Sequence, residues 1–181
     1  MSDPRADAFA EGLARLNALG AVEAEERFLA CCGSRAWARA MAERRPFADA
    51  DALARAADEV WWALAPEDWL EAFAAHPRIG EAEVGGHGQA GARSASWSEA
   101  EQAGTRAAAD ETLRALEEGN RRYEDRFGHV FLIRAAGRSA ADMLSALTER
   151  ISNDPEAELR VAAAQQAEIM RSRLARLVAE G

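Results

Sequence analysis

The sequence predicts an all-α fold, a single compact helical domain of about eight helices that covers residues 1–181. Alanine is abundant, and leucine, glutamate and arginine fill much of the remainder; all four are strong helix formers. The chain has 181 residues, of which 49% are hydrophobic and 29% are charged, an ordinary balance for one domain with a substantial core. Residues typical of helix ends separate the helical stretches, and neither a linker nor an internal repeat divides the chain.

The predicted helices follow one another with short connections. They cover residues 6–19, 22–31, 34–44, 49–64, 66–75, 98–123, 139–151 and 155–178. The helix over 66–75 ends before Pro77, because a proline ring crowds the residue before it out of the α region.

Three later helices carry start signals. Ser98-Glu-Ala-Glu101 and Ser139-Ala-Ala-Asp142 have the layout of a capping box, and Asp154-Pro155 places an N-cap residue before a proline at the first helical position. The last helix is expected to bury an apolar stripe along one face. That stripe consists of Leu159, Ala162, Ala163, Met170, Leu174 and Leu177.

Two segments fall outside the helical pattern. The β-branched and aromatic run from His129 to Ala135 follows Gly128 and could be a short strand or an extended buried connection. Residues 81–96 are rich in glycine and alanine, have no apolar period, and are expected to form a loop directly after His76.

Composition excludes several classes of protein. A net charge of −9 argues against nucleic-acid binding, and the apolar runs are far shorter than a membrane span. The ends of the chain show neither a secretory signal nor a peroxisomal address. Cys31 and Cys32 are adjacent, which suits neither a disulfide framework nor a zinc site, so we expect a cytoplasmic protein without a metal.

His76 is the first candidate catalytic residue, because it stands where a helix meets a proline and only three histidines occur in the chain. Imidazole has an ordinary pKa of about 6.5 and can exchange protons at neutral pH. The alternative is a histidine that only hydrogen-bonds the last carbonyls of its helix. His87 and His129 are weaker candidates, one in the glycine-rich loop and the other before the extended segment.

Glu101 and Gln102 are the second candidates. A carboxylate beside an amide near a helix N-terminus could orient a polar ligand, and the free N–H groups there favour an anion. The alternative is that Glu101 reaches back to cap its own helix from Ser98.

Among the arginines of the last helix, Arg173 borders the apolar face, since it lies three residues after Met170 and four before Leu177. It could either snorkel its charged end toward water or hold a carboxylate with two parallel N–H groups. Arg171 is expected to be more solvated.

These residues belong to a set of short stretches that occur together and in a fixed order. Through that set, the chain resembles the family of 2-oxo-4-hydroxy-4-carboxy-5-ureidoimidazoline (OHCU) decarboxylases over about residues 22–178. The block His76-Pro-Arg-Ile-Gly80 is the most specific. The other matching stretches are Cys32-Gly33-Ser34 with Trp37 and Met41, Arg45-Pro46-Phe47, Asp68-Trp69 with Phe73, Ser98 with Glu101-Gln102, Phe127-Gly128 with Phe131-Leu-Ile133, Gly137-Arg138-Ser139 with Met143-Leu144, and Arg150 with Asn153-Asp154 and Glu158-Leu159.

The resemblance implies an all-helical homodimer that uses no metal or organic cofactor and decarboxylates OHCU to (S)-allantoin in urate degradation. It puts the catalytic pair on His76 and Glu101, and substrate contacts on Pro77, Ser98, Gln102 and Arg173, with backbone groups offered to the ring from Leu132, Ile133, Arg134 and Ala135. Arg134 departs from the small or apolar residues common at its position. The contrasting hypothesis is a non-catalytic helical protein that binds a cyclic ureide or is only structural.

Overall fold

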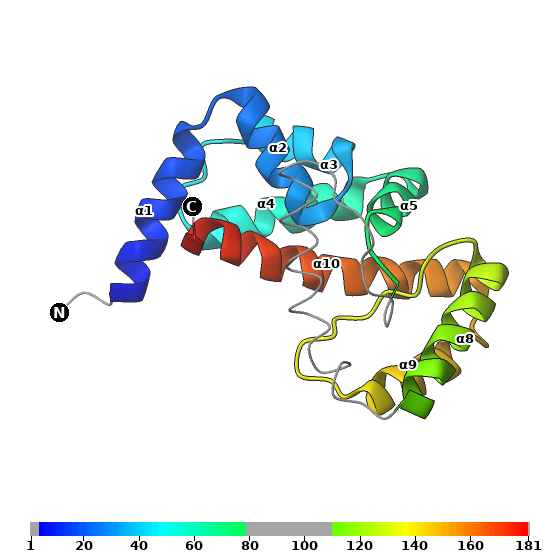
Figure 1. Cartoon of the computed structure of the whole chain (residues 1–181). Coiled ribbons are helices and arrows are strands. Elements are labelled where there is room, and N and C mark those ends of the chain that lie inside the picture. The colour runs from blue at the N-terminus through cyan, green and yellow to red at the C-terminus, as the bar shows by residue number, and fades with distance from the viewer. Residues whose placement is uncertain (1–3, 79–109, 181) are drawn as a thin grey trace. The chain divides into compact units, whose positions relative to one another are not determined.

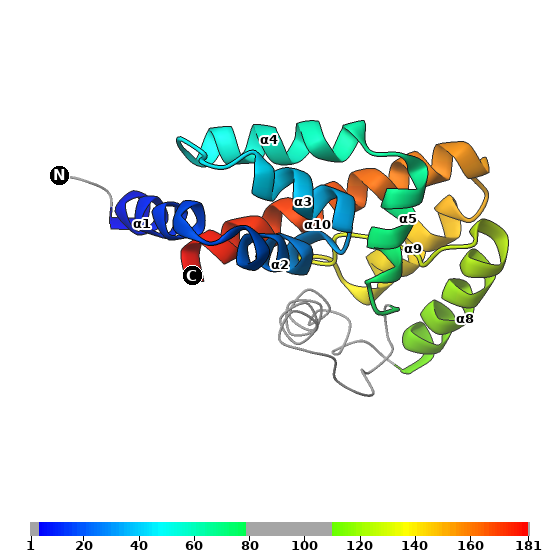
Figure 2. The same ribbon diagram turned by 90° about the horizontal axis from the view of Figure 1, so that it is seen from above.

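The computed structural model describes residues 4–78 and 110–180. These residues form eight α-helices and no β-strand, which confirms the all-α prediction (Figures 1 and 2). The helices are α1 (Pro4–Ala18), α2 (Ala21–Cys32), α3 (Arg35–Glu43), α4 (Ala50–Ala63), α5 (Pro66–Ala74), α8 (Asp110–Phe127), α9 (Ala140–Arg150) and α10 (Pro155–Glu180).

Most helix ends agree with the sequence prediction to within a few residues, and α8 is the main difference. It runs to Phe127, one turn beyond the predicted end at residue 123, and Gly128 follows it with a φ of 74°. The extra turn places the Phe127 ring 4.7 Å from the Tyr123 ring, so the two aromatic residues support one another on one face of the helix. Residues 98–109 of the predicted helix lie outside the described residues.

The chain divides into two compact units by the density of its internal contacts. The first unit consists of Met1–Glu71 and Ala167–Gly181, and the second unit consists of Ala72–Gln166. Two such units can belong to one domain, so the single domain over residues 1–181 stays a prediction.

The core of the first unit is built on α2, α3 and α4. Helices α2 and α3 lie side by side, and α3 also packs against α4 (Figure 1). Trp37 is fully buried and its indole N–H donates to the carbonyl of Ala57 at 3.1 Å, which joins α3 to α4 through a satisfied hydrogen bond. The ring of Phe28 meets Trp37 edge-on, with centroids 5.9 Å apart.

Arg45 closes the C-terminal end of α1. Its Nη1 donates to the carbonyls of Leu16 at 3.0 Å and of Leu19 at 2.7 Å. Carbonyl groups at the C-terminal end of a helix have no N–H donor within the helix, so a side chain can supply one. The side chain of Asn17 completes the connection, because it donates to the carbonyl of Phe47 and accepts from its N–H, both at 2.9 Å. The stretch from Arg45 to Phe47 therefore anchors α1 to the rest of its unit.

The second unit has a separate core between α8 and α9, which pack against one another (Figure 2). Its cluster of buried residues is Leu116, Tyr123, Phe131, Ile133, Ala135, Ala140, Met143 and Leu147. Two of the three predicted caps are confirmed here, and the third, at Ser98, lies outside the described residues. Ser139 and Asp142 form a reciprocal capping box at α9, and Asp154 Oδ1 accepts from the N–H of Glu156 at 3.0 Å at the start of α10.

The residues from His129 to Ala135 form an extended connection from α8 toward α9, without strand pairing among the residues that the structure describes. The predicted stripe of α10 is buried at five of its six positions, and Leu159 is half-buried. Within residues 4–78 and 110–180, no helix is long and apolar enough to cross a membrane.

Candidate functional site

His76 lies just beyond the end of α5, as the sequence predicted. The helix ends in hydrogen bonds of the 3₁₀ type, which span three residues. The N–H of Ala75 donates to the carbonyl of Ala72 at 3.3 Å, and the N–H of His76 donates to the carbonyl of Phe73 at 3.0 Å. Pro77 follows and prevents further helix. His76 is buried, with 9% of its surface exposed. A titratable imidazole is thus enclosed by protein at a point where the backbone leaves a helix.

Side-chain contacts within the second unit hold the chain on both sides of His76. Arg78 donates from Nε to Oε1 of Glu124 at 2.6 Å and from Nη2 to Oε2 at 2.8 Å, which is a bidentate pair with α8. On the other side, the ring of Phe73 packs against the imidazole of His129 with centroids 5.3 Å apart. Two independent contacts therefore position the backbone of His76.

His129 is a buried histidine surrounded by aromatic rings. Besides Phe73, it meets Tyr123 at a centroid distance of 5.5 Å and stacks with Phe127 at 6.1 Å. Burial lowers the pKa of His129 below its ordinary value, and the 3.1 Å contact of its Nδ1 with the carbonyl of Val130 offsets only part of that effect. A neutral imidazole in this place serves the packing of the second unit.

A cluster of buried and half-buried polar side chains joins α8, α9 and α10 next to this aromatic group. Glu158 is fully buried, and its Oε1 accepts from Arg150 Nε at 2.9 Å and from Nη2 at 2.6 Å. The hydroxyl of Tyr123 also donates to Oε1, and Asn153 Nδ2 donates to Oε2 at 2.7 Å. We call these four residues the Arg150–Glu158 cluster. Burial, reinforced by the Glu158 hydrogen bond, raises the pKa of Tyr123, so its hydroxyl remains a donor at neutral pH.

The extended segment from Leu132 to Ala135 runs across this cluster. Arg150 Nη1 donates to the carbonyl of Leu132 at 2.7 Å, and the N–H of Arg134 donates to Oε1 of Gln165 at 3.0 Å. Leu132, Ile133 and Ala135 are buried, whereas the side chain of Arg134 is exposed. The unusual arginine therefore does not enter the core of the second unit.

Arg171 and Arg173 of α10 have different surroundings in the first unit. Arg173 is buried with 1% of its surface exposed. Arg171 is exposed and forms a bidentate pair with Asp58, from Nε to Oδ1 at 2.8 Å and from Nη2 to Oδ2 at 2.9 Å, which raises the pKa of Arg171. The prediction from helix spacing, that Arg173 faces inward and Arg171 outward, agrees with this burial.

Four predicted features lie outside the described residues. They are Ser98, Glu101, Gln102 and the loop over residues 81–96. Among the residues that are described, no group of three or more His, Cys, Asp or Glu side chains is placed to hold a metal ion.

Sequence reasoning gave no role to the Arg150–Glu158 cluster. A signal for it exists in the spacing of α10, because Glu158, Gln166 and Arg173 fall on the same face as Ala162, Met170 and Leu177, and all six are buried. A polar residue on an apolar face must find a buried partner. The sequence shows that a partner is required but does not show which residue supplies it.

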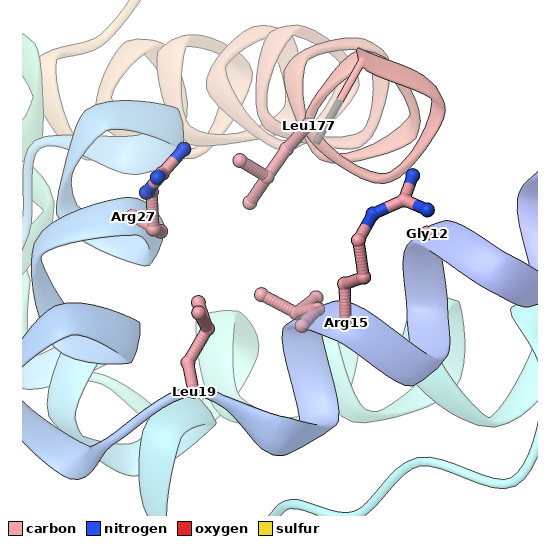
Figure 3. Close-up of a pocket in the computed structure, with 6 residues that line it drawn as sticks. Gly12, Arg15, Leu19, Arg27 and Leu177 are labelled. Atoms are coloured by element: carbon pink, nitrogen blue, oxygen red, sulfur yellow. The ribbon is translucent and has the colours of Figure 1, made fainter.

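The first unit contains a small cavity of about 50 Å³, lined by Gly12, Arg15, Leu16, Leu19, Arg27 and Leu177. Figure 3 shows Leu19 and Leu177 turned toward one another across it. Sites for small organic ligands usually measure about 300–1,000 Å³, so this cavity is too small to be one.

Comparison with known proteins identifies a family match over most of the chain. The family model described as OHCU decarboxylase matches residues 17–175. In a curated relative, the uric acid degradation bifunctional protein TTL of Arabidopsis thaliana, 158 residues align at 38% identity. They make up 86% of this chain and 48% of the relative, so the chain spans about half of that protein's length.

Two solved structures share the fold. A crystal structure of OHCU decarboxylase in the presence of (S)-allantoin superposes with a TM-score of 0.73 at 34% identity, covering 84% of this chain and 97% of that one. A crystal structure of (S)-allantoin synthase gives a TM-score of 0.66 at 19% identity, covering 91% of this chain and 53% of that one. The second match is evidence for the fold alone.

Proposed function

The chain belongs to the OHCU decarboxylase family, and on that premise we propose that it decarboxylates OHCU to (S)-allantoin in urate degradation. The single observation that carries the proposal is the match of the family model to residues 17–175. It is supported by the 34% identity to an OHCU decarboxylase whose structure this chain covers almost completely.

The substrate can supply its own electron sink. The carbon that loses carbon dioxide carries a hydroxyl group and adjoins a ring C=N bond. When the bond to the carboxylate breaks, its electron pair moves into the C=N bond and the ring nitrogen takes up a proton. Protonation of the neighbouring carbon and loss of the hydroxyl proton then give the carbonyl of allantoin, so the proposed reaction needs neither metal nor organic cofactor. The face that is protonated determines whether the S enantiomer forms.

In this proposal His76 transfers a proton near the hydroxyl and the scissile carboxylate, and Pro77 lines the site beside it. Burial of His76 at a fixed helix end supports this role, because acid–base catalysis requires a positioned group. Glu101 orients the hydroxyl or ureido N–H groups, and Ser98 and Gln102 contact the substrate from the same stretch of chain.

Two further groups complete the proposed site. The backbone from Leu132 to Ala135 reads the ring amides, and the contacts of Arg150 and Gln165 with that backbone support such a fixed role. Arg173 holds the anionic substrate. Its burial on the inner face of α10 supports this choice over Arg171, which is exposed.

We further propose that the enzyme is a cytoplasmic homodimer. Cys31 and Cys32 are both buried as thiols, which suits a reducing compartment. Light scattering of the purified protein measures the oligomeric state, and a monomeric mass would contradict the dimer.

The test of the activity uses freshly generated products of urate oxidation. Adding the protein should accelerate the appearance of the circular dichroism signal of (S)-allantoin above the spontaneous reaction, which gives a racemate. An unchanged spontaneous decay would contradict the proposal and favour the non-catalytic alternative.

A further inference from the structure

We propose that Arg150 and Gln165 are positioning residues that hold the backbone around Ile133 in the conformation that binds the substrate ring. The inference rests on the proposed function, in which this backbone reads the ring amides. It assigns a role to Arg150, which belongs to a stretch that matches the family but is not among the proposed site residues.

The two side chains hold the segment on both sides of Ile133. Arg150 Nη1 donates to the carbonyl of Leu132 at 2.7 Å, and its Cζ lies 4.5 Å from the centre of the Phe131 ring. Gln165 Oε1 accepts the N–H of Arg134 at 3.0 Å. An extended segment has no helical hydrogen bonds of its own, so contacts of this kind determine where its peptide groups point.

Arg150 is itself held in one orientation. Its Nε and Nη2 both donate to Oε1 of Glu158, at 2.9 and 2.6 Å, while Nη1 remains directed at Leu132. The side chain of Glu158 is fully buried and that of Arg150 is 11% exposed. One planar guanidinium thus joins a buried carboxylate and a backbone carbonyl, a geometry that the single nitrogen of a lysine does not reproduce.

A purely structural role for the cluster makes a different prediction. Such a role requires only that the buried charge of Glu158 is compensated, because an unpaired buried charge is strongly destabilising. Lysine at position 150 would provide that compensation. The positioning role requires in addition the contact with Leu132, which lysine should lose while the protein stays folded.

The experiment compares Arg150→Lys and Gln165→Met with the wild-type enzyme. The matched control is Arg126→Lys, because Arg126 also donates to a backbone carbonyl, that of Asn153 at 3.1 Å, and also lies over an aromatic ring, that of Phe127 at 5.2 Å. For each variant, hydrogen exchange of the peptide covering residues 130–136, thermal stability, and kcat and KM for OHCU are measured.

We expect both test variants to keep their helical circular dichroism and to exchange the amides of residues 130–136 at least ~10-fold faster than wild type. Their kcat/KM for OHCU should fall ~10- to 100-fold, since small misplacements of binding groups have effects of this size. The control should stay within about two-fold of wild type in both measurements.

Normal exchange and normal kcat/KM in both test variants would overturn the proposal, and so would faster exchange with unchanged kcat/KM. If Arg150→Lys does not fold, Gln165→Met decides, because it leaves the Arg150–Glu158 pair intact. Absence of (S)-allantoin formation by the wild type would instead refute the proposed function, and the exchange data would still show whether the two side chains hold the segment.

Discussion

Arg78 and Glu124 form a bidentate ion pair, with Nε 2.6 Å from Oε1 and Nη2 2.8 Å from Oε2. The pair connects the backbone two residues after His76 to the last turn of α8. An exposed pair contributes only about 0–1 kcal/mol to the free energy of unfolding, so its main effect is on geometry. It fixes the direction in which the chain leaves His76.

Breaking this pair should therefore reduce activity more than stability. We expect Arg78→Ala or Glu124→Gln to lower kcat/KM for OHCU by ~10-fold through misplacement of His76, with little change in melting temperature. The exchanged pair Arg78→Glu with Glu124→Arg should recover part of the loss. Steady-state kinetics and thermal melts of the same preparations measure both quantities.

The matched control for the ion pair is Asp58→Asn. It disrupts another bidentate pair between an exposed arginine and a carboxylate, Arg171 with Asp58, whose distances are 2.8 and 2.9 Å. Its kcat/KM should stay within about two-fold of wild type. Equal losses in Asp58→Asn and Glu124→Gln would show that general surface charge, rather than the position of His76, is responsible.

Replacing His76 should remove most of the catalytic power. His76→Asn is expected to lower turnover by at least ~10²-fold, the lower end of the contribution of a positioned acid–base group. The control is His129→Phe, which replaces another buried histidine of the same unit by a residue that suits its aromatic surroundings. Near-normal formation of one allantoin enantiomer by His76→Asn would contradict the assignment.

The features that the sequence predicted correctly are those that depend on neighbours in the chain. The capping box at Ser139 and the end of α5 before Pro77 follow from interactions within a few residues. The inward direction of Arg173 follows from helix periodicity. The all-α class follows from composition.

The Arg150–Glu158 cluster could not be predicted in this way. Tyr123, Arg150 and Glu158 come from three helices, and only the packing of α8, α9 and α10 brings them together. Helix periodicity indicates that Glu158 is on a buried face, but it does not identify a partner at a distance along the chain. The choice between a strand and an extended connection for residues 129–135 likewise depended on whether another strand was available to pair with them.

Arg171 and Arg173 of α10 should respond differently to substitution. We expect Arg173→Lys to lower kcat/KM by ~10- to 100-fold, the equivalent of one or two lost charge-assisted hydrogen bonds. Arg171→Gln should leave kcat/KM within about two-fold of wild type, because its guanidinium is held by Asp58. The reverse pattern would assign the substrate to Arg171. Circular dichroism of each variant ensures that only folded protein is compared.

His129 should make stability depend on pH. Burial lowers its pKa in the folded protein below the ordinary 6.5, so below about that pH the unfolded chain binds more protons than the folded one. The free energy of unfolding therefore falls as the pH decreases below about 6.5, by at most about 1.4 kcal/mol per pH unit for one proton. His129→Phe should show a smaller decrease in urea titrations. Equal slopes in the two proteins would contradict this prediction.

Gly12 permits a close approach of α1 to α10 in the first unit. A Cβ atom at this position would lie 1.8 Å from the carbonyl oxygen of Val178, and backbone atoms of a helix cannot move aside as a flexible side chain could. Gly12→Ala should therefore lower the free energy of unfolding by about 1–3 kcal/mol or more, as other overpacked substitutions do.

The same substitution should also affect activity if Arg173 is the substrate arginine. Val178 lies five residues after Arg173 on α10, so a displacement that relieves the collision moves the helix that carries Arg173. Gly20→Ser is the control, because a Cβ at Gly20 meets nothing within 4 Å and serine suits this N-cap position. Thermal melts and kcat/KM should both decrease for Gly12→Ala and remain near wild type for Gly20→Ser. Equal melting temperatures in the two variants would show that α1 can move away from α10 without loss of stability.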